Sequence, residues 1–190
     1  NVSQDELRKA VLPHVQDGFL RVDIAAIRNT VEALPWVYRA SVRRKWPASL
    51  QVDISEQRAI ARWGDDGLIN REGGVFMVKP EGELAQLPQL YGPENNEKML
   101  VSSYKEMQRL LQPVGLGIRK LELSQRRAWQ LSLDNGVTLL LGRKESYRRL
   151  LRFVRVYPRV LAEKMEQIER IDMRYTNGFA VRWNEEAATA

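Results

Sequence analysis

The chain holds few side chains that could carry out a reaction. Its one histidine, His14, falls on a short predicted helix with no acid placed to orient it, as a histidine base would require. The acid pairs Asp65–Asp66 and Glu185–Glu186 could act as paired carboxylates, but adjacent acids in a turn or tail are usually solvated. Gly115–Leu116–Gly117 lacks the third glycine of a dinucleotide-binding loop. The sequence therefore predicts no catalytic residue, no metal site and no cofactor.

The composition narrows the class of protein further. At 190 residues and 44% hydrophobic, the chain is long enough for one large folded domain or two small ones. The absence of cysteine excludes disulfides and a thiolate zinc site. No apolar run approaches the ~18 residues of a membrane span. Because the chain begins with Asn1 rather than methionine, we expect a fragment whose targeting segment is not shown.

A cluster of basic residues, 143–159, accounts for much of the net charge of +6 and predicts a two-faced helix. One stripe is apolar: Tyr147, Leu150, Leu151, Val154 and Leu161. The other is basic: Lys144, Arg148, Arg152, Arg155 and Arg159. The basic stripe is either a solvated face or a contact for an acidic protein or anionic lipid. Nucleic acid is the least favoured partner for this stripe, because no aromatic residues for base stacking lie between these arginines.

The first third of the chain predicts two short helices followed by a β-hairpin. Ser3 and Glu6 have the spacing of a capping box, and Asp23 can cap the second helix. Alternating apolar residues then predict two strands, at 38–42 and 50–54. Because two strands rarely form a stable sheet alone, we expect a third strand just before the first residue.

The remainder predicts short strands with helices between them. Turn signals at Gly64–Gly67 and Gly73–Gly74 separate strand-like runs, and 79–93 is predicted to be loop. A helix follows, with an apolar stripe from Met99 to Leu111. Three strands come next: Ile118–Leu123, Ala128–Leu133 and Val137–Leu141. Antiparallel strands, tight turns and intervening helices together predict the α+β class.

The stretch "RIDMRYTNGFAVRW", 170–183, predicts a closing hairpin. A three-residue loop, Thr176–Gly178, with Gly178 in the left-handed conformation, gives one apolar face and an ion pair on the other. The predicted pairs are Tyr175 with Phe179, Met173 with Val181, Ile171 with Trp183, and Asp172 with Arg182. No later strand is available to cover 179–183, so this strand is predicted to lie at the edge of the sheet.

Four stretches carry a resemblance to a known family. "LPWVYRASVRRKWPASLQVDISEQRAIARW", 34–63, resembles the end of a POTRA (polypeptide-transport-associated) domain passing into the next domain. "LYGPE", "RRAWQLSLDNGVTLLLGR" and "IDMRYTNGFAVRW" resemble the FtsQ/DivIB family of bacterial cell-division proteins, most of all its proteobacterial branch. The resemblance implies a POTRA domain over 1–57 without its first strand, a mostly antiparallel β domain with two helices over 58–185, and a tail over 186–190.

The resemblance also implies a function. Family members are non-enzymatic scaffolds of the division machinery (divisome), periplasmic at the septum and anchored to the inner membrane by an upstream helix. They bind the coiled-coil partners FtsB and FtsL, and the POTRA domain contacts other division proteins. A segment of FtsB adds a strand beside the last strand. The alternative is a chaperone-like module that binds extended chains generally.

The partner-binding positions of the family fall on named residues of this chain. They are Arg126, Arg174, Tyr175, Asn177, Gly178 and Trp183, with Phe179 and Val181 on the added edge and Arg148, Arg152 and Arg155 on the basic helix. A structural interpretation competes for several of them. Tyr175 and Trp183 could instead be core residues, and Asn177 and Gly178 could be present because the turn needs them. Arg126 could be an ordinary charged residue at the end of a strand. Asn177 departs from the serine of other members, so the family's hydrogen bond there is not carried over.

Overall fold

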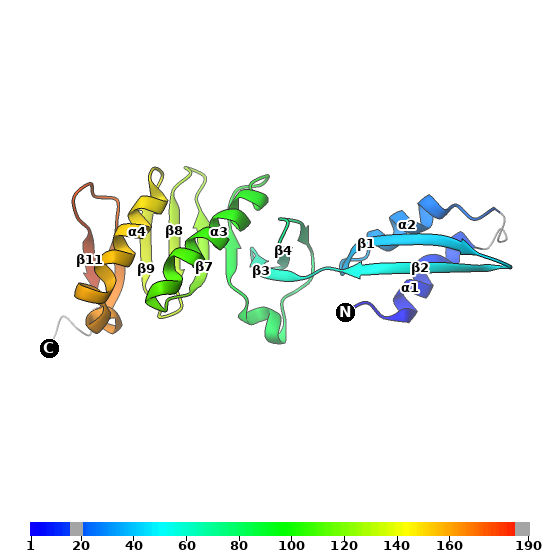
Figure 1. The fold of residues 1–190 in the computed structure, drawn as a ribbon, viewed down its shortest axis with the longest axis horizontal. Helices are drawn as coiled ribbons and strands as arrows, with labels where there is room; N and C mark the ends of the chain where they lie inside the picture. The colour runs from blue at the N-terminus through cyan, green and yellow to red at the C-terminus, as the bar shows by residue number, and fades with distance from the viewer. Residues whose placement is uncertain (16–20, 185–190) are drawn as a thin grey trace. The chain divides into compact units, whose positions relative to one another are not determined.

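A computed structural model describes residues 1–15 and 21–184 (Figure 1). The predicted tail 186–190 and the acid pair Glu185–Glu186 lie outside the described residues. The chain divides into two compact units. Unit 1 comprises Asn1–Arg58 with Phe76–Val78, and unit 2 comprises Ala59–Val75 with Lys79–Ala190.

Unit 1 has the predicted order of helices and hairpin. Its elements are α1 Gln4–Val11, η1 Leu12–His14, α2 Ile24–Glu32, β1 Val37–Lys45 and β2 Ser49–Glu56. Both predicted caps are confirmed. The Ser3 hydroxyl accepts the Glu6 N–H while the Glu6 carboxylate accepts the Ser3 N–H, and the Asp23 carboxylate accepts two N–H groups at the start of α2.

The core of unit 1 lies between α2 and one face of the hairpin. Ile27 and Val31 of α2 are fully buried against the alternate strand residues Ala40 and Val42. His14 has a structural partner: its Nε2 lies 2.8 Å from the hydroxyl of Thr30. This bond between the first helical segment and α2 accounts for the one histidine of the chain.

Unit 2 is built on a nine-stranded sheet with the order β11-β10-β9-β8-β7-β6-β3-β4-β5. The strands are β3 Ala59–Trp63, β4 Gly67–Asn70, β5 Val75–Phe76, β6 Gln89–Tyr91, β7 Ile118–Leu123, β8 Trp129–Leu133, β9 Thr138–Gly142, β10 Ile168–Asp172 and β11 Ala180–Trp183. Most neighbours are antiparallel, but β10 is parallel to β9. The α+β prediction is confirmed, including the strands over 118–142.

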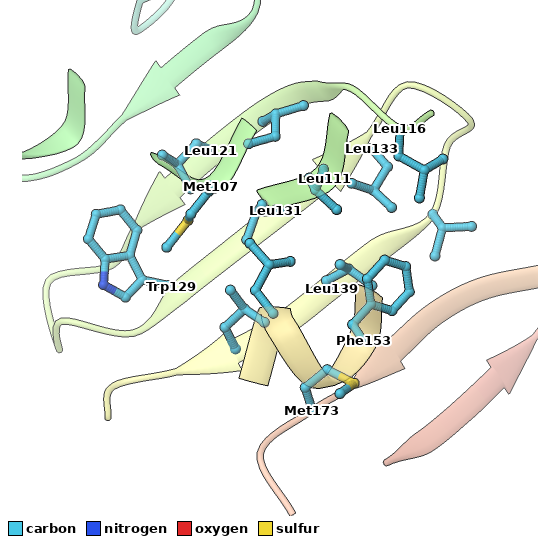
Figure 2. Packing of buried hydrophobic residues seen from close by; sticks show 14 of the residues in the cluster. Met107, Leu111, Leu116, Leu121, Trp129, Leu131, Leu133, Leu139, Phe153 and Met173 are labelled. Atoms are coloured by element: carbon cyan, nitrogen blue, oxygen red, sulfur yellow. The ribbon is translucent and has the colours of Figure 1, made fainter. Parts of the chain in front are cut away.

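Two helices, α3 Glu97–Leu111 and α4 Ser146–Val156, cover one face of strands β7 to β9 (Figure 1). The other helical segments are η3 Gly82–Gln86, η4 Gln112–Val114, the π-helical η5 Tyr157–Leu161 and η6 Ala162–Gln167. Figure 2 shows Met107 and Phe153 of the helices among strand residues such as Leu131 and Leu139, all fully buried. Within the part of the chain that the structure describes, no helix has the length and apolar character to cross a membrane.

One strand lies where the sequence predicted only loop. β6, Gln89–Tyr91, pairs in parallel with both β3 and β7, and Leu90 is fully buried. Three residues bounded by Pro88 and Gly92 are too few to show alternation, so the strand is defined by its neighbours on both sides rather than by its own sequence.

The basic helix is rotated from the predicted orientation. Phe153, outside the predicted apolar stripe, is fully buried with Leu150, whereas Leu151 is exposed. The assignment of Leu151 to the buried stripe is therefore wrong. Leu161 is buried but lies beyond the α-helix, which ends at Val156 where the π-helical turn with Pro158 begins. The larger aromatic ring faces the sheet, and Leu151 turns toward the neighbouring arginines.

Candidate functional site

The closing hairpin places β11 at the edge of the nine-stranded sheet, as predicted. β11 pairs with β10 on one side, and no described strand pairs with its other side. An edge strand exposes a row of backbone N–H and C=O groups that can template another chain.

The hydrogen bonds of the neighbouring strands define which groups of β11 face outward. The Met173 N–H donates to the Leu140 carbonyl of β9, and backbone groups of successive strand residues point to opposite sides. Asp172 therefore turns its backbone toward β11, where it pairs with Ala180. By the same alternation, the N–H and C=O of Val181 point away from β10. Phe179 and Trp183, two residues on either side, share this outward direction.

The register of the hairpin differs from the predicted one. Ile171 pairs with Val181 and Asp172 with Ala180, two residues out of step with the predicted pairs. A shift of two keeps every side chain on its predicted face, so the apolar face survives. The connection spans 173–179, and Gly178 is not left-handed. The predicted three-residue turn and the Asp172–Arg182 ion pair are both wrong, and Arg182 instead pairs with Glu169 at 2.9 Å.

Arginines of α4 explain why the short turn does not form. Arg152 donates to the carbonyls of Met173, Tyr175 and Thr176 at 2.9, 2.8 and 2.7 Å. Arg149 donates to the carbonyl of Arg174 at 3.0 Å, and to that of Leu141 at the end of β9. Four consecutive carbonyls, 173–176, thus turn toward the helix instead of closing a tight hairpin. Charged donors make stronger hydrogen bonds than neutral ones, so this arrangement fixes the loop.

The predicted basic stripe missed Arg149, which contacts the loop as directly as Arg152. The spacing of three residues between them, on the side of the helix next to buried Leu150 and Phe153, is the signal that could have identified it. Gly142 makes room for Arg149: it has a φ of +74°, and a Cβ there would lie 2.9 Å from a guanidinium nitrogen of Arg149. Glycine is favoured at this point because L residues with a side chain rarely adopt this φ, and an added Cβ would also displace the Arg149 guanidinium.

A groove of about 440 Å³ lies between α4 and the loop. Its lining brings together several predicted residues: Arg148, Arg152, Arg155, Tyr175 and Asn177, with Leu151 and Arg149 beside them. Arg148 pairs with Glu145 at 2.8 Å on the surface. The Nε–H of Arg152 is buried and has no acceptor among the described residues. A buried donor without an acceptor is costly to the stability of the fold.

The two aromatic residues of the hairpin lie outside the core. Tyr175 is 58% exposed and Trp183 is 42% exposed, whereas Phe179 and Val181 are half-buried and pack against the core. The core interpretation of Tyr175 and Trp183 is therefore wrong. The two exposed rings flank the ends of β11, where they can contact a chain laid along the edge.

The structure contradicts the left-handed turn conformation predicted for Gly178, whereas partner binding by Asn177 and Gly178 stays a prediction. Asn177 is exposed beside the groove. Gly178 has no positive φ, and an added Cβ would meet nothing within 4 Å. The fold therefore does not demand glycine at 178, contrary to the structural interpretation. The open space there remains available to a second chain.

Arg126 lies in the exposed turn between β7 and β8. This turn is at the same end of the sheet as the 173–179 loop, because β8 begins opposite the end of β9, and β10 runs parallel to β9. Strands β9 and β10 separate β8 from β11, a span of roughly 10–15 Å. The neighbouring Arg127 donates to the Asn96 side chain. The structure thus places Arg126 apart from the groove but at the same end of the sheet as the 173–179 loop.

Arg174 is engaged within the hairpin. The Arg174 guanidinium donates two hydrogen bonds to the Asp172 carboxylate, at 2.6 and 2.8 Å. The backbone N–H of Arg174 donates to the same carboxylate. The side-chain hydrogen bonds from Arg174 are the main cause that lowers the pKa of Asp172 below its ordinary value.

This ion pair predicts a pH dependence of stability. A lowered folded-state pKa means that ionised Asp172 stabilises the fold above about pH 4. That contribution is lost as the pH falls through the folded-state value. When the pH falls from about 5 to about 3, we expect the free energy of unfolding to decrease less in Asp172→Asn than in wild type. The difference should be no more than about 1 kcal/mol, because solvent screens the exposed Arg174. Urea unfolding at both pH values measures this, and identical pH slopes would contradict it.

Sequence comparison matches both parts of the chain to known domains. Residues 61–174 match the profile described as cell division protein FtsQ/DivIB, C-terminal, and residues 1–57 match that described as POTRA domain, FtsQ-type. Both matches agree with the expected order of domains along the chain.

Curated proteins named cell division protein FtsQ are similar over nearly the whole chain. The protein of Xanthomonas campestris is 40% identical over 95% of this chain and 64% of its own length. The protein of Coxiella burnetii is 35% identical over 96% of this chain and 75% of its own length. The protein of Escherichia coli K12 is 37% identical over 94% of this chain and 67% of its own length. The chain thus spans about two thirds to three quarters of the length of these relatives.

Proposed function

Because this chain belongs to the FtsQ/DivIB family of bacterial cell-division proteins, we propose that it is a non-enzymatic scaffold of the divisome that binds FtsB through the free edge of β11. In this proposal the chain is the periplasmic domain of a protein that is anchored in the inner membrane and located at the septum. FtsL binds together with FtsB as a coiled coil, and unit 1 contacts other division proteins. The unpaired edge of β11 is the single observation that carries the proposal.

Strand addition fits the outward backbone groups at Val181. An extended segment gains affinity from main-chain hydrogen bonds and selectivity from alternate side chains. On this edge, selectivity comes from the exposed rings of Tyr175 and Trp183 at its two ends. Aromatic residues of this kind often dominate the binding energy of an interface. The space beside Gly178 lets the partner backbone approach closely.

Acidic residues of the partner are accommodated at two places. Arg126 is exposed at the same end of the sheet as the loop and can pair with one acid. The groove beside α4 offers the exposed Arg148 and Arg155 to another.

The aromatic anchors give a first test of the proposal. We expect Tyr175→Ala and Trp183→Ala each to weaken binding of the periplasmic part of FtsB by about 1–2 kcal/mol, because both rings are exposed and available to a partner. Calorimetric titration measures the affinity. The control is Tyr38→Ala, a half-exposed tyrosine of unit 1, which should leave the affinity unchanged. Full affinity in both hairpin variants would count against the proposal.

A second candidate function is general binding of extended chains. The same free edge favours it, because backbone pairing depends little on sequence. Competition distinguishes the two: unrelated extended peptides should displace FtsB from a general binder but not from a selective scaffold.

A further inference from the structure

The hairpin of unit 1 extends past the core that supports its base. Burial along β1 ends at Val42, and every residue from 43 to 49 is exposed. Figure 1 shows β1 and β2 tapering to a tip beyond α1 and α2. We call the segment Arg43–Pro47 the tip. The two strands are joined there by the three-residue connection 46–48, next to the pair of Lys45 with Ser49. A tip that supports no core is free to be used for contact.

The chemistry of the tip is unusual for a solvated turn. Trp46 is 78% exposed, the most exposed large hydrophobic side chain among the described residues. Arg43, Arg44 and Lys45 directly precede it, and 43–50 contains no acid. A largely exposed indole beside three cations offers apolar surface and positive charge to the same partner.

The cations beside Trp46 lie on both faces of the hairpin. Arg43 and Lys45 point to the outer face of the hairpin, because alternate residues share a face. Arg44 points to the helix face, where its guanidinium donates to the Val22 carbonyl at 2.7 Å. The nearest acid along the strands, Asp53, accepts from Gln51. The tip is therefore a small convex wedge with positive charge on both faces.

We propose that this tip, Arg43–Pro47, docks onto the surface of an anionic lipid bilayer. Tryptophan rings favour the interface between headgroups and acyl chains, and arginine or lysine beside them binds anionic headgroups. A wedge that carries cations on both faces can be surrounded by headgroups. A protein hot spot instead lies at the centre of a flat patch ringed by contacts, and single-stranded nucleic acid needs several rings for stacking. This site is distinct from the β11 edge, and its failure would leave the proposed function intact.

Vesicle binding by the whole chain tests the proposal. We expect partition onto phosphatidylcholine vesicles only when about one third of the lipid is phosphatidylglycerol, and a decrease with added salt. The double variant Arg43→Gln/Lys45→Gln should bind roughly 30-fold more weakly, from the loss of two cations near the surface. Trp46→Ala should bind about tenfold more weakly, because the variant lacks the ring that would enter the bilayer interface.

Matched variants in unit 2 make the test specific. Arg148→Gln/Arg155→Gln removes two exposed cations from the basic helix, and Trp183→Ala removes another exposed indole. Both should retain vesicle binding within about threefold of wild type, since neither group belongs to the tip. Equal losses in the tip and helix variants, no binding to anionic vesicles, or Trp46-dependent binding to an oligonucleotide instead would each overturn the proposal.

Discussion

Replacing Val181 by proline is expected to weaken FtsB binding at least about 100-fold while the domain stays folded. The N–H of Val181 points away from β10, so the fold does not use it, and proline is tolerated on an edge strand whose N–H faces solvent. An added strand would lose this donor and meet the proline ring. Titration of FtsB against the variant measures the loss.

The matched control moves the proline by one residue. Ala180 pairs with Asp172, so its N–H faces β10, and Ala180→Pro removes a hydrogen bond inside the hairpin. We expect this variant to lose stability, whereas Val181→Pro should retain most of it. If Val181→Pro binds FtsB as tightly as wild type, the partner does not pair with the outer edge of β11.

Arg152→Ala is expected to lower the free energy of unfolding by about 3 kcal/mol and to weaken FtsB binding as well. The guanidinium donates to the carbonyls of Met173, Tyr175 and Thr176, which would otherwise lose these donors beside α4. Without it, the loop that carries Tyr175 loses its fixed position. Urea unfolding and FtsB titration measure the two effects.

Two further substitutions separate geometry from charge. Arg148→Ala removes an exposed arginine one turn away, paired only with Glu145 on the surface, and should change stability by less than about 0.5 kcal/mol. Arg152→Lys keeps the charge but not the planar fork, so it should resemble Arg152→Ala more than wild type. If Arg152→Ala and Arg148→Ala are equally stable, the arginine does not hold the loop.

The strands with clear alternation and tight turns could be predicted from the sequence. The runs over 118–142 show both, and the structure has strands there. The edge position of β11 was predicted from the order of the strands along the chain, because antiparallel strands that follow one another usually pair, and the sheet order confirms it for the described strands. β6 could not be predicted, since its three residues become a strand only by pairing with β3 and β7 on both sides.

The hairpin register shows where reasoning from one sequence ends. Asn177–Gly178 is a strong local signal for a tight turn. However, Arg149 and Arg152, more than twenty residues earlier, donate hydrogen bonds to carbonyls of this segment. Local turn preference is a fraction of the stabilisation that several charged hydrogen bonds supply. The same contacts create the groove, so the sequence named several residues that line it but could not predict its shape, and their role in binding stays a prediction.

Amide hydrogen exchange with and without the periplasmic part of FtsB tests the central claim most directly. Alternation predicts that the amides of Ala180 and Arg182 are protected in the free chain, because they face β10. Those of Phe179, Val181 and Trp183 face outward and should gain protection only when FtsB binds. That alternate pattern would establish the edge of β11 as the docking strand. Bound FtsB that leaves the Val181 amide in rapid exchange would contradict it.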